Sequence, residues 1–575
     1  MPLRLFIASF AAFFIFSDVA AQNELRIPPV LEGTQFDLTM APSSHEFFSG
    51  VQTDTYGFNG SYLGPTLIFN KGATVTLNVT NSIGEPSTVH WHGMHVTPED
   101  DGGPHSVIEA GTTWSPQFEV LDNATTFWYH PHLHEHTSEH VYRGLAGMII
   151  VRDEVEALLA LPRTYGEDDI PVIIQDRQFI PNRQLLFNEG GVGQQGTTIV
   201  INGTVDPFLE AKAGILRLRL LNGSNSRVYQ VGMSDNSEVQ QIGSDGGLLP
   251  SPVSLTRIRM APGERVEILL DLNGRSGENL SLMSYSSELT RNEPGGVPDA
   301  GAPAGPPGNI DGTDFELMEI RIVDSDANSV LTIPDALVSI EPIPESETDR
   351  VRPIILNTVG GPGTPLAING VEMDLDVVNE VVQLGDTEIW EIQNRTGGPH
   401  PFHIHDIQFQ ILDRGGQPPA PNEAGWKDVV LVYPQETVRF ITRFLDFADP
   451  VTPFMYHCHF LGHEDGGMMG QFIVIDPAAT AIEHPEPRAG EFMITAYPNP
   501  TTSWSTISYT IPTRSQVRID LFDSLGRHIK KLFEGYRSAG ENEAVWKAGD
   551  VSTGTYFIRM IIDGAVSTRS VSVIR

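Results

Sequence analysis

Histidine is distributed unevenly along this chain of 575 residues, and that distribution restricts how the chain can fold. His-x-His pairs occur in two regions, whereas no histidine lies between His140 and His400. In a β-strand, residues two apart point to the same face, so each pair can direct both imidazoles at one metal site. If the pairs share a site, the two flanking regions must meet in space, and the histidine-free middle must hold them in register.

Four short motifs contain these pairs. One pair alone would be weak evidence of a metal site, because surface histidines often stand two apart. Four pairs in one chain are not plausibly accidental, and they predict a cluster of metal ions. The motifs are His90-Trp91-His92-Gly93, His130-Pro131-His132, His400-Pro401-Phe402-His403-Ile404-His405, and His457-Cys458-His459 with His463 and Met468 after it.

The fourth motif contains the only cysteine of the chain, Cys458, so no disulfide can form within the chain. On a strand, Cys458 points away from the face that carries His457 and His459, and one tripeptide can therefore serve two metal centres. Two imidazoles, a thiolate and a weak thioether are the ligands of blue copper sites. Zinc also accepts cysteine and histidine, but it has no redox chemistry and gives no reason for the other histidines.

Composition and local pattern predict a mostly β protein. Glycine and proline are frequent, at 55 and 42 residues, and helix-favouring runs are scarce. Short stretches such as residues 74–79 alternate apolar with polar side chains, which is typical of half-buried strands. A chain of this length exceeds one hydrophobic core and should divide into three or four domains.

Changes in pattern along the chain indicate the domain boundaries. Three strand-rich segments follow one another, and a polar, proline-containing stretch separates them from a small final unit. The expected units are residues 25–155, 168–325 and 350–476 as β-sandwiches, 477–492 as a linker, and 493–575 as a C-terminal β-domain. Within them we expect a closing strand at 145–151, a turn at 244–250, an alternating strand at 265–271, and an exposed loop at 294–309.

The first residues have the pattern of a secretory signal peptide. A positively charged start precedes an apolar run over residues 5–16 and small residues up to Ala21, after which we expect cleavage. The run is shorter than the roughly 20 apolar residues of a membrane-spanning helix, so no membrane insertion is expected. The net charge of −37 argues against nucleic acid or anionic membranes as partners. It is explained by solubility outside the cell, or by attraction of cationic substrates.

The four motifs resemble those of multicopper oxidases, a family of three cupredoxin domains that includes laccases, bilirubin oxidases and bacterial copper-efflux oxidases. The resemblance covers about residues 30–476, and all four motifs occur in the family order. Residues 244–250 and 463–469 resemble the copper-efflux branch most. The resemblance implies an all-β fold of three cupredoxin-like Greek-key β-sandwich domains, followed here by the small C-terminal β-sandwich.

By this resemblance, the protein would bind four copper ions. A type 1 copper would take electrons from the substrate, and a type 2 copper with a type 3 pair would bind and reduce dioxygen. The implied ligands are His400, Cys458, His463 and Met468 for type 1, with Met469 a weaker axial candidate; His90 and His403 for type 2; and His92, His130, His132, His405, His457 and His459 for type 3.

Oxygen reduction consumes protons, and two acidic residues, Asp101 and Glu464, lie in or beside the motifs. In similar bacterial enzymes the acids at these positions relay protons. The alternative is that both carboxylates orient imidazoles through hydrogen bonds. His134, His136 and His140 could form a further metal site, although positions in a solvated loop are the simpler interpretation.

The final unit resembles the C-terminal sorting domain of proteins exported by the type IX secretion system. The resemblance rests on Tyr497-Pro498-Asn499-Pro500, the turn Leu525-Gly526-Arg527 and a Gly-x-Tyr strand that begins at Gly554. It implies passage through the periplasm to the cell surface or exterior, with the secretion machinery as a partner, and it leaves open whether this domain is removed. The alternative is a generic carbohydrate-binding or structural β-module.

The sequence therefore predicts a secreted, laccase-like multicopper oxidase whose reactants are dioxygen and a small reducing substrate. The reductants would be phenols, aromatic amines or low-valent metal ions. An alternative is a cuprous-ion oxidase for copper tolerance, which the dispersed methionines do not favour. A non-catalytic scaffold, like the cell-division proteins of this family that have lost their copper ligands, disagrees with the complete ligand set. A copper nitrite reductase disagrees with it for the same reason.

Overall fold

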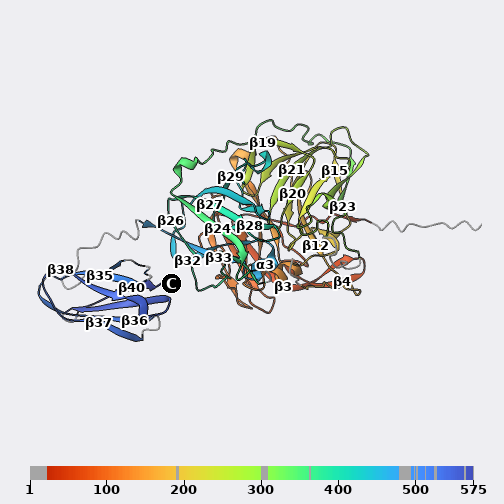
Figure 1. The fold of residues 1–575 in the computed structure, drawn as a ribbon. Helices are drawn as coiled ribbons and strands as arrows, with labels where there is room; N and C mark the ends of the chain where they lie inside the picture. Colours follow the sequence, from red (N-terminus) through yellow and green to blue (C-terminus); the bar gives the residue numbers. More distant parts are fainter. Residues whose placement is uncertain are drawn as a thin grey trace, which may run out of the picture. The chain divides into compact units, whose positions relative to one another are not determined.

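The computed structural model of the protein divides into two compact units, Met1–Asp476 and Pro477–Arg575 (Figure 1). Among the described residues, no helix is long and apolar enough to span a membrane. The predicted signal peptide, nearly all of the predicted linker 477–492, and much of the predicted loop 294–309 lie outside the described part. The structure describes residues 22–188, 193–298, 308–361, 364–477, 494–497, 499, 501, 503–511, 513–523, 527–562 and 565–573.

The first sandwich of the larger unit consists of facing sheets. Its elements are β2 (Val30–Glu32), β3 (Gln35–Phe48), β4 (Val51–Phe58), β5 (Thr66–Asn70), β6 (Thr74–Asn81), β7 (His90–His92), β8 (Thr113–Trp114), β9 (Gln117–Glu119), β10 (Thr125–His130), α1 (Thr137–Arg143), β11 (Gly147–Arg152) and α2 (Glu154–Ala157). The sheet orders are β4-β3-β6-β8, with β9 beside β6, and β2-β5-β11-β10-β7. Side chains of β6 alternate between buried and more exposed positions, as predicted. The buried ones pack in a core with Phe36, Phe127 and Ile149.

The second sandwich contains the histidine-free middle of the chain. Its elements are β1 (Asn23–Glu24), β12 (Asp169–Arg177), β13 (Thr198–Ile201), β14 (Thr204–Val205), β15 (Pro207–Lys212), β16 (Ile215–Asn222), β17 (Tyr229–Met233), β18 (Val239–Ser244), β19 (Gly247–Leu255), β20 (Ile258–Met260), β21 (Arg265–Asp271), β22 (Asn279–Tyr285), η1 (Ser286–Glu288) and β23 (Asp314–Val323). The sheet orders are β1-β15-β23-β22-β17-β20 and β14-β13-β12-β16-β21-β18-β19. Strand β21 has the predicted place, but its polar residues Arg265 and Glu267 are buried too. Their charges are paired: Arg265 forms an ion pair with Asp428 of the third sandwich, and Glu267 forms one with Arg219 of its own sandwich.

The third sandwich has the same arrangement of facing sheets. Its elements are η2 (Glu345–Glu347), β24 (Arg350–Thr358), β25 (Leu366–Ile368), β26 (Glu380–Gln383), β27 (Thr387–Asn394), β28 (His400–Ile404), β29 (Gln410–Arg414), η3 (Pro421–Glu423), β30 (Val429–Val432), β31 (Thr437–Arg443), β32 (Asp449–Cys458), α3 (Leu461–Asp465) and β33 (Met469–Ile475). The sheet orders are β25-β24-β27-β31-β29 and β26-β33-β32-β28-β30. Trp390, Phe402 and Phe440 lie in the core between them, together with Cys458.

The smaller unit is a β-sandwich with a core of its own. Its elements are β34 (Ile494–Tyr497), β35 (Trp504–Ile511), β36 (Ser515–Asp523), β37 (His528–Arg537), β38 (Gly540–Lys547), η4 (Ala548–Asp550), β39 (Gly554–Ile562) and β40 (Ala565–Val573). The sheet orders are β34-β35-β38 and β37-β36-β39-β40. Ile507, Leu521, Trp546 and Ile558 are buried between the sheets. The predicted all-β architecture is confirmed for both units.

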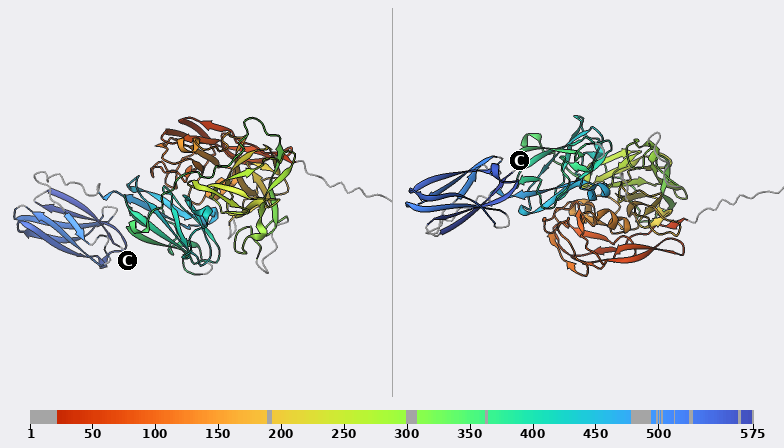
Figure 2. Two further views of the ribbon diagram at one scale, coloured as in Figure 1. Left: turned by 90° about the horizontal axis from the view of Figure 1, so that it is seen from above. Right: turned by 60° about the horizontal axis from the view of Figure 1, so that its bottom comes forward.

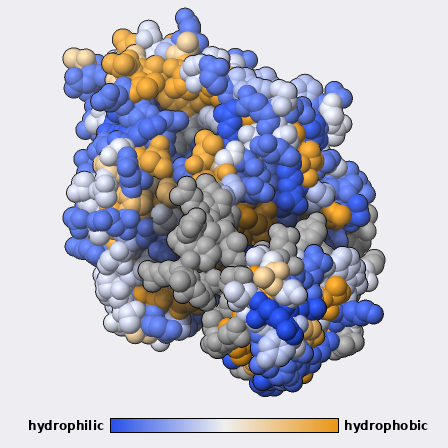
Figure 3. All heavy atoms as spheres, turned by 90° about the vertical axis from the view of Figure 1, so that its left-hand side faces the viewer, coloured by the Kyte–Doolittle hydropathy of each residue, from blue (hydrophilic) through white to orange (hydrophobic). Residues whose placement is uncertain are grey.

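The three sandwiches of the larger unit lie against one another (Figure 2), and polar side chains connect them at their junction. Thr126 Oγ1 of the first donates a hydrogen bond to Glu267 Oε1 of the second, at 2.7 Å. Lys427 Nζ of the third donates to Glu264 Oε1 of the second, at 3.0 Å. On the face drawn in Figure 3, hydrophilic side chains predominate and apolar ones form separate patches, which agrees with the acidic composition. The predicted metal ligands lie at the junction, where buried charge is concentrated.

Candidate metal centre

Strand pairing brings the histidine motifs together two by two. In the first sandwich β7 pairs with β10, and His90 stands opposite His130. In the third sandwich β28 pairs with β32, and His403 stands opposite His457. Each flanking region thus presents two motifs on neighbouring strands, and His132, His405 and His459 follow shortly after the strand ends.

The motif histidines form one buried group across the first and third sandwiches. We call this group the histidine cluster; it comprises His90, His92, His130, His132, His403, His405, His457 and His459. Within it, nitrogen atoms of three residues at a time lie within 4.8 Å of one another. These sets are His92, His130 and His459; His132, His405 and His457; and His90, His92 and His403. All three sets draw on both sandwiches, as a shared site requires from the distribution of histidine along the chain.

The imidazoles of the cluster are held from outside by acceptors that fix which nitrogen carries hydrogen. His90 Nδ1 lies 2.9 Å from the main-chain oxygen of Asp101, and His130 Nδ1 lies 2.8 Å from that of Pro131. A carbonyl oxygen can only accept, so both Nδ1 atoms donate and both Nε2 atoms carry a lone pair. Buried His90 Nε2 and His403 Nε2 have no hydrogen-bond partner among the described residues. Their lone pairs are therefore available to a cation.

The inner nitrogens of the cluster face one another at short distances. His132 Nε2 and His405 Nε2 lie 3.1 Å and 3.3 Å from His457 Nε2, and His130 Nε2 lies 3.3 Å from His92 Nδ1. Burial lowers the pKa of His405 to about 3 and holds that of His92 and His132 well below the usual value. Neutral imidazoles that face one another with lone pairs repel unless a cation lies between them. The residues thus fit metal ions that accept imidazole, copper among them.

Asp101 and Glu464, the predicted proton relay, contact the cluster directly. Asp101 Oδ2 accepts a hydrogen bond from His405 Nδ1 at 2.8 Å. Glu464 Oε1 and Oε2 each lie 3.2 Å from an Nδ1 atom, those of His132 and His457 respectively. Burial raises the pKa of both carboxyl groups, but the neighbouring imidazoles outweigh it, and the net shift of each pKa is downward. Asp101 therefore accepts a hydrogen bond that orients the His405 ring, and Glu464 lies beside two further imidazoles of the cluster.

The second group of predicted ligands lies in the third sandwich, and we call it the sulfur site: His400, Cys458, His463 and Met468. Cys458 Sγ lies 3.4 Å from His400 Nδ1 and 3.5 Å from His463 Nδ1. The Met468 N–H donates to the His463 carbonyl at 2.8 Å, and the Met468 carbonyl accepts from Cys458 N at 3.1 Å. Burial raises the pKa of the Cys458 thiol, so a metal is needed to displace its proton.

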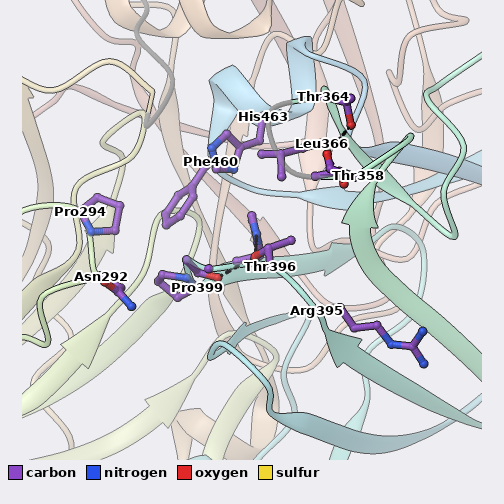
Figure 4. A pocket seen from close by; sticks show the side chains of 14 residues that line it. Asn292, Pro294, Thr358, Thr364, Leu366, Arg395, Thr396, Pro399, Phe460 and His463 are labelled. Atoms are coloured by element: carbon purple, nitrogen blue, oxygen red, sulfur yellow. Dashed lines mark hydrogen bonds between the residues drawn. The ribbon is translucent and has the colours of Figure 1, made fainter.

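A cavity of 610 Å³ opens beside the sulfur site, and His400 and His463 form part of its wall. Figure 4 shows the His463 and Phe460 side chains across this cavity from Pro399 and Thr396, with the Arg395 guanidinium pointing away from His463. Apolar atoms line most of the cavity. Among the described lining residues, Arg395 is the one with a permanent charge, and none is a methionine or a carboxylate.

The three further histidines after the second motif do not form a metal site in the described structure. No set of three close ligand atoms includes His134, His136 or His140. The expectation of a solvated loop is wrong for His140, which is buried on α1. It is buried because its Nδ1 lies 3.1 Å from Ser87 Oγ and its Nε2 lies 3.3 Å from Glu85 Oε1.

Two charged residues at the cluster were not predicted from the sequence. Asp428 Oδ1 accepts from His92 Nε2 at 3.1 Å, and the Asp428 main-chain oxygen accepts from His403 Nδ1 at 2.9 Å. Arg265 of the second sandwich forms an ion pair with Asp428. Neither residue belongs to a motif. The available signal was a charged residue at the start of an otherwise apolar run, which occurs at many solvent-exposed positions as well.

Comparison with known proteins gives matches over most of the chain. Two family models described as multicopper oxidase match residues 39–156 and 348–478, and one described as a secretion system C-terminal sorting domain matches residues 495–574. The multicopper oxidase mco of Staphylococcus haemolyticus is 34% identical over 466 residues, which are 79% of this chain and 93% of that protein. The cell division protein FtsP of Escherichia coli is 34% identical over 474 residues, which are 80% of this chain and 94% of that protein.

A solved structure shows the same fold. The bacterial laccase-like multi-copper oxidase CueO from Ochrobactrum sp. is 34% identical and superposes with a TM-score of 0.70, over 78% of this chain and 100% of that one. Its published description assigns it oxidase activity towards lignin model compounds and lignosulfonate. An oxidase and a cell division protein are thus equally identical to this chain, and the ligand residues must distinguish between the two kinds of relative.

Proposed function

Since this chain belongs to the multicopper oxidase family, we propose that it is a secreted oxidase that takes single electrons from a small organic substrate and reduces dioxygen to water. The sulfur site would hold a type 1 copper. In the histidine cluster, His90 and His403 would hold a type 2 copper, and the other members would hold a type 3 pair, which makes four ions. Copper, when bound, supplies one-electron redox chemistry and the ability to bind dioxygen.

One observation carries this proposal: the tripeptide His457-Cys458-His459 belongs to both sites. Cys458 lies in the core of the third sandwich beside His400 and His463, whereas its two neighbours contribute to the histidine cluster. A short covalent path therefore joins the place where electrons enter to the place where oxygen is reduced. Dioxygen needs four electrons, while a typical organic substrate gives one at a time, so the two sites need such a connection.

The carboxylates around the cluster have two tasks in this proposal. Asp101 accepts the outer N–H group of His405, and Glu464 lies 3.2 Å from the outer nitrogens of His132 and His457, so these carboxylates keep the inner lone pairs directed at the metal positions. The same carboxylates pass protons to the oxygen-reducing site. We expect Glu464→Gln to slow reoxidation by dioxygen more than reduction by substrate; equal slowing of both steps would contradict the relay.

The cavity beside the sulfur site favours organic reductants. Its wall is mostly apolar, and His463 is only partly buried, so an aromatic ring can approach an imidazole edge. Soft cuprous ions prefer thioether and thiolate ligands, and the described lining residues contain no methionine. The described activity of the Ochrobactrum sp. relative towards lignin model compounds is consistent with phenols as substrates.

The first experiment removes the sulfur ligand. We expect Cys458→Ser to abolish the blue absorption and the oxidation of every substrate, because serine cannot supply a thiolate. Met468→Leu should shift the spectrum, and Met469→Leu is the matched control that should leave it unchanged. A blue and active Cys458→Ser protein would refute the assignment of the sulfur site.

The second experiment distinguishes the substrates. Oxygen uptake by the copper-loaded protein is measured with a simple methoxyphenol and with cuprous ion. We expect faster turnover of the phenol, because the cavity offers apolar contact and few soft ligands. Faster turnover of cuprous ion would replace the organic oxidase with a copper-detoxifying one, and uptake with neither would revive the scaffold alternative.

Export follows from the final unit. The match to a secretion system sorting domain indicates transport to the cell surface or exterior. We propose that the chain crosses the inner membrane by means of its first 21 residues and reaches the exterior through the machinery that recognises residues 493–575. Fractionation of cells that produce the full chain, compared with a chain ending at residue 476, tests this route.

A further inference from the structure

The histidine-free second sandwich reaches the histidine cluster through one buried arginine. Arg265 begins β21, and its side chain is 0% exposed. Its Nη1 donates to Asp428 Oδ1 at 2.7 Å and its Nη2 to Asp428 Oδ2 at 2.5 Å. Two parallel bonds of this kind fix the plane of a carboxylate, whereas a single bond would leave it free to turn.

Every other donor of this guanidinium is also bound. Nε donates to the Thr126 carbonyl at 3.1 Å, the second Nη1 hydrogen to the Gly263 carbonyl at 2.9 Å, and the second Nη2 hydrogen to the Asp245 carbonyl at 3.0 Å. Thr126 belongs to the first sandwich, whereas the two other acceptors belong to the second. The five N–H groups of Arg265 therefore connect all three sandwiches at one point.

Asp428, which Arg265 holds, in turn holds two imidazoles of the cluster. Its Oδ1 accepts from His92 Nε2 at 3.1 Å, so the lone pair of His92 is on Nδ1, which faces His130 Nε2. Its main-chain oxygen accepts from His403 Nδ1 at 2.9 Å, so the lone pair of His403 is on Nε2. Asp428 thus selects opposite tautomers for the His92 and His403 rings, which stack with their centroids 3.8 Å apart.

A second acidic residue, Asp245, contacts both Arg265 and the residue before Asp428. Asp245 lies in the turn between β18 and β19, within the segment 244–250 that the sequence had marked. Its Oδ1 accepts from the Arg265 main-chain N–H at 2.9 Å, and its Oδ2 forms an ion pair with Lys427 Nζ at 2.9 Å. Lys427 precedes Asp428 in the chain. The turn therefore clamps both sides of the Arg265–Asp428 pair.

We propose that Arg265 is a positioning residue for oxygen reduction: by orienting the Asp428 carboxylate it fixes the ring and the tautomer of His92, on which the His403 ring stacks. The inference rests on the proposed function, because it assumes that the cluster binds copper. The middle sandwich supplies no ligand to the cluster, and in this proposal it contributes the orientation of the ligands. A purely structural ion pair would affect folding alone and would leave the metal positions as they are.

The test compares Arg265→Met with a matched control, Arg352→Met. Arg352 is also buried and bidentate, with Nε and Nη2 donating to Glu388 at 2.8 Å and 2.6 Å, but the described structure shows no contact between it and the cluster. Copper affinity is measured by competition with a chelator, the type 2 copper by its paramagnetic resonance, and the sulfur site by its blue absorption. Thermal unfolding of the metal-free proteins reports the structural effect separately.

We expect Arg265→Met to weaken copper binding at the cluster by about 10- to 100-fold and to retain the blue absorption. Arg352→Met should lower stability and leave both copper signals unchanged. Arg265→Lys should restore stability without restoring the cluster, because one ammonium cannot hold both carboxylate oxygens. Equal copper affinity in Arg265→Met and Arg352→Met, or recovery of the cluster in Arg265→Lys, would overturn the proposal.

A second variant keeps the test decisive if Arg265→Met does not fold. Asp428→Asn has nearly the same shape, but its single amide oxygen cannot accept from both His92 Nε2 and Arg265 Nη2, so the two-oxygen contact with Arg265 is lost or His92 loses its acceptor, and the same selective loss at the cluster is expected. Full copper binding by Asp428→Asn would also overturn the proposal. The two possible failures are distinguishable: if the unchanged protein binds no copper at the cluster, the proposed function fails as well, whereas a normal unchanged protein confines the failure to Arg265.

Discussion

Asp101 and Asp428 contact the histidine cluster in the same way. Each accepts one hydrogen bond with its main-chain oxygen and one with its carboxylate. Asp101 of the first sandwich accepts from His90 with its main-chain oxygen and from His405, in the third, with its carboxylate. Asp428 of the third sandwich accepts from His403 with its main-chain oxygen and from His92, in the first, with its carboxylate. Each aspartate therefore joins one proposed type 2 ligand to one proposed type 3 ligand across the boundary between the sandwiches.

The difference between the two aspartates lies in their other contacts. Both carboxylate oxygens of Asp428 are bound by Arg265, whereas Asp101 makes no ion pair with arginine or lysine among the described residues. Asp101 Oδ1 lies 3.3 Å from His90 Nδ1 without an acceptable hydrogen bond to any described residue. Asp428, whose carboxylate is bound by Arg265, thus has a fixed position. Asp101 has no such arginine, and its Oδ1 atom stays available to protons.

The largest effect is expected from Gly102→Ala, which displaces the Asp101 side of the cluster. Gly102 has φ +77°, and a Cβ there would lie 1.7 Å from the main-chain oxygen of Val89. Left-handed backbone and a clash with backbone together should cost about 2–5 kcal/mol of unfolding free energy and abolish turnover. Gly111→Ala is the control, because its φ is +80° and nothing lies within 4 Å. Equal stability of the two variants in denaturant unfolding would contradict this account.

Asp101→Asn tests the free oxygen itself. The amide oxygen can still accept from His405, so copper should stay bound, while loss of the carboxylate should slow reoxidation by dioxygen by about 10²- to 10⁴-fold. Rapid mixing of the reduced protein with oxygen measures this step, and the rate of bleaching by substrate serves as the internal control. If Asp101→Asn loses copper as Asp428→Asn is expected to, then both aspartates only position imidazoles, and the comparison fails.

A smaller effect is expected from Gly263→Ala on the Asp428 side. Gly263 precedes Arg265 closely, has φ +85°, and a Cβ there would lie 3.0 Å from the His459 ring. The ring has to shift by a few tenths of an ångström, which should lower turnover roughly tenfold, because larger misplacements near 1 Å cost about 10²-fold. Gly274→Ala, with φ +72° and open space, is the control. Unchanged turnover relative to Gly274→Ala would show that His459 tolerates the added carbon.

The sequence predicted the candidate ligands, which the structure brings together, but it did not predict the Arg265–Asp428 pair beside them. His-x-His spacing and the lone Cys458 are local patterns, and strand geometry alone places Cys458 and its neighbours on opposite faces. Arg265 and Asp428 look like ordinary exposed charges, and their burial depends on which sandwich covers them. The alternating strand expected at 265–271 is present, but its polar residues are buried as well, for the same reason. Tertiary contacts decide where charges can be buried in pairs, and no short-range pattern records them.

The smallest effect is expected at the sulfur site. There a neutral hydroxyl makes the contact to the outer imidazole nitrogen that the two aspartates make at the histidine cluster. Thr396 Oγ1 lies 2.7 Å from His400 Nε2, on the far side of the ring from Cys458. Thr396→Val removes this acceptor and makes His400 a weaker base, which should raise the reduction potential of the type 1 copper by about 20–60 mV, the one-electron equivalent of about 0.5–1.5 kcal/mol. Redox titration of the blue absorption measures the shift, and Thr396→Ser keeps the hydroxyl as the control. If both variants shift the potential, the cause is the change in the cavity wall and not the hydrogen bond. If neither variant shifts it, a hydrogen bond on the outer nitrogen of the ring matters only where its acceptor is charged.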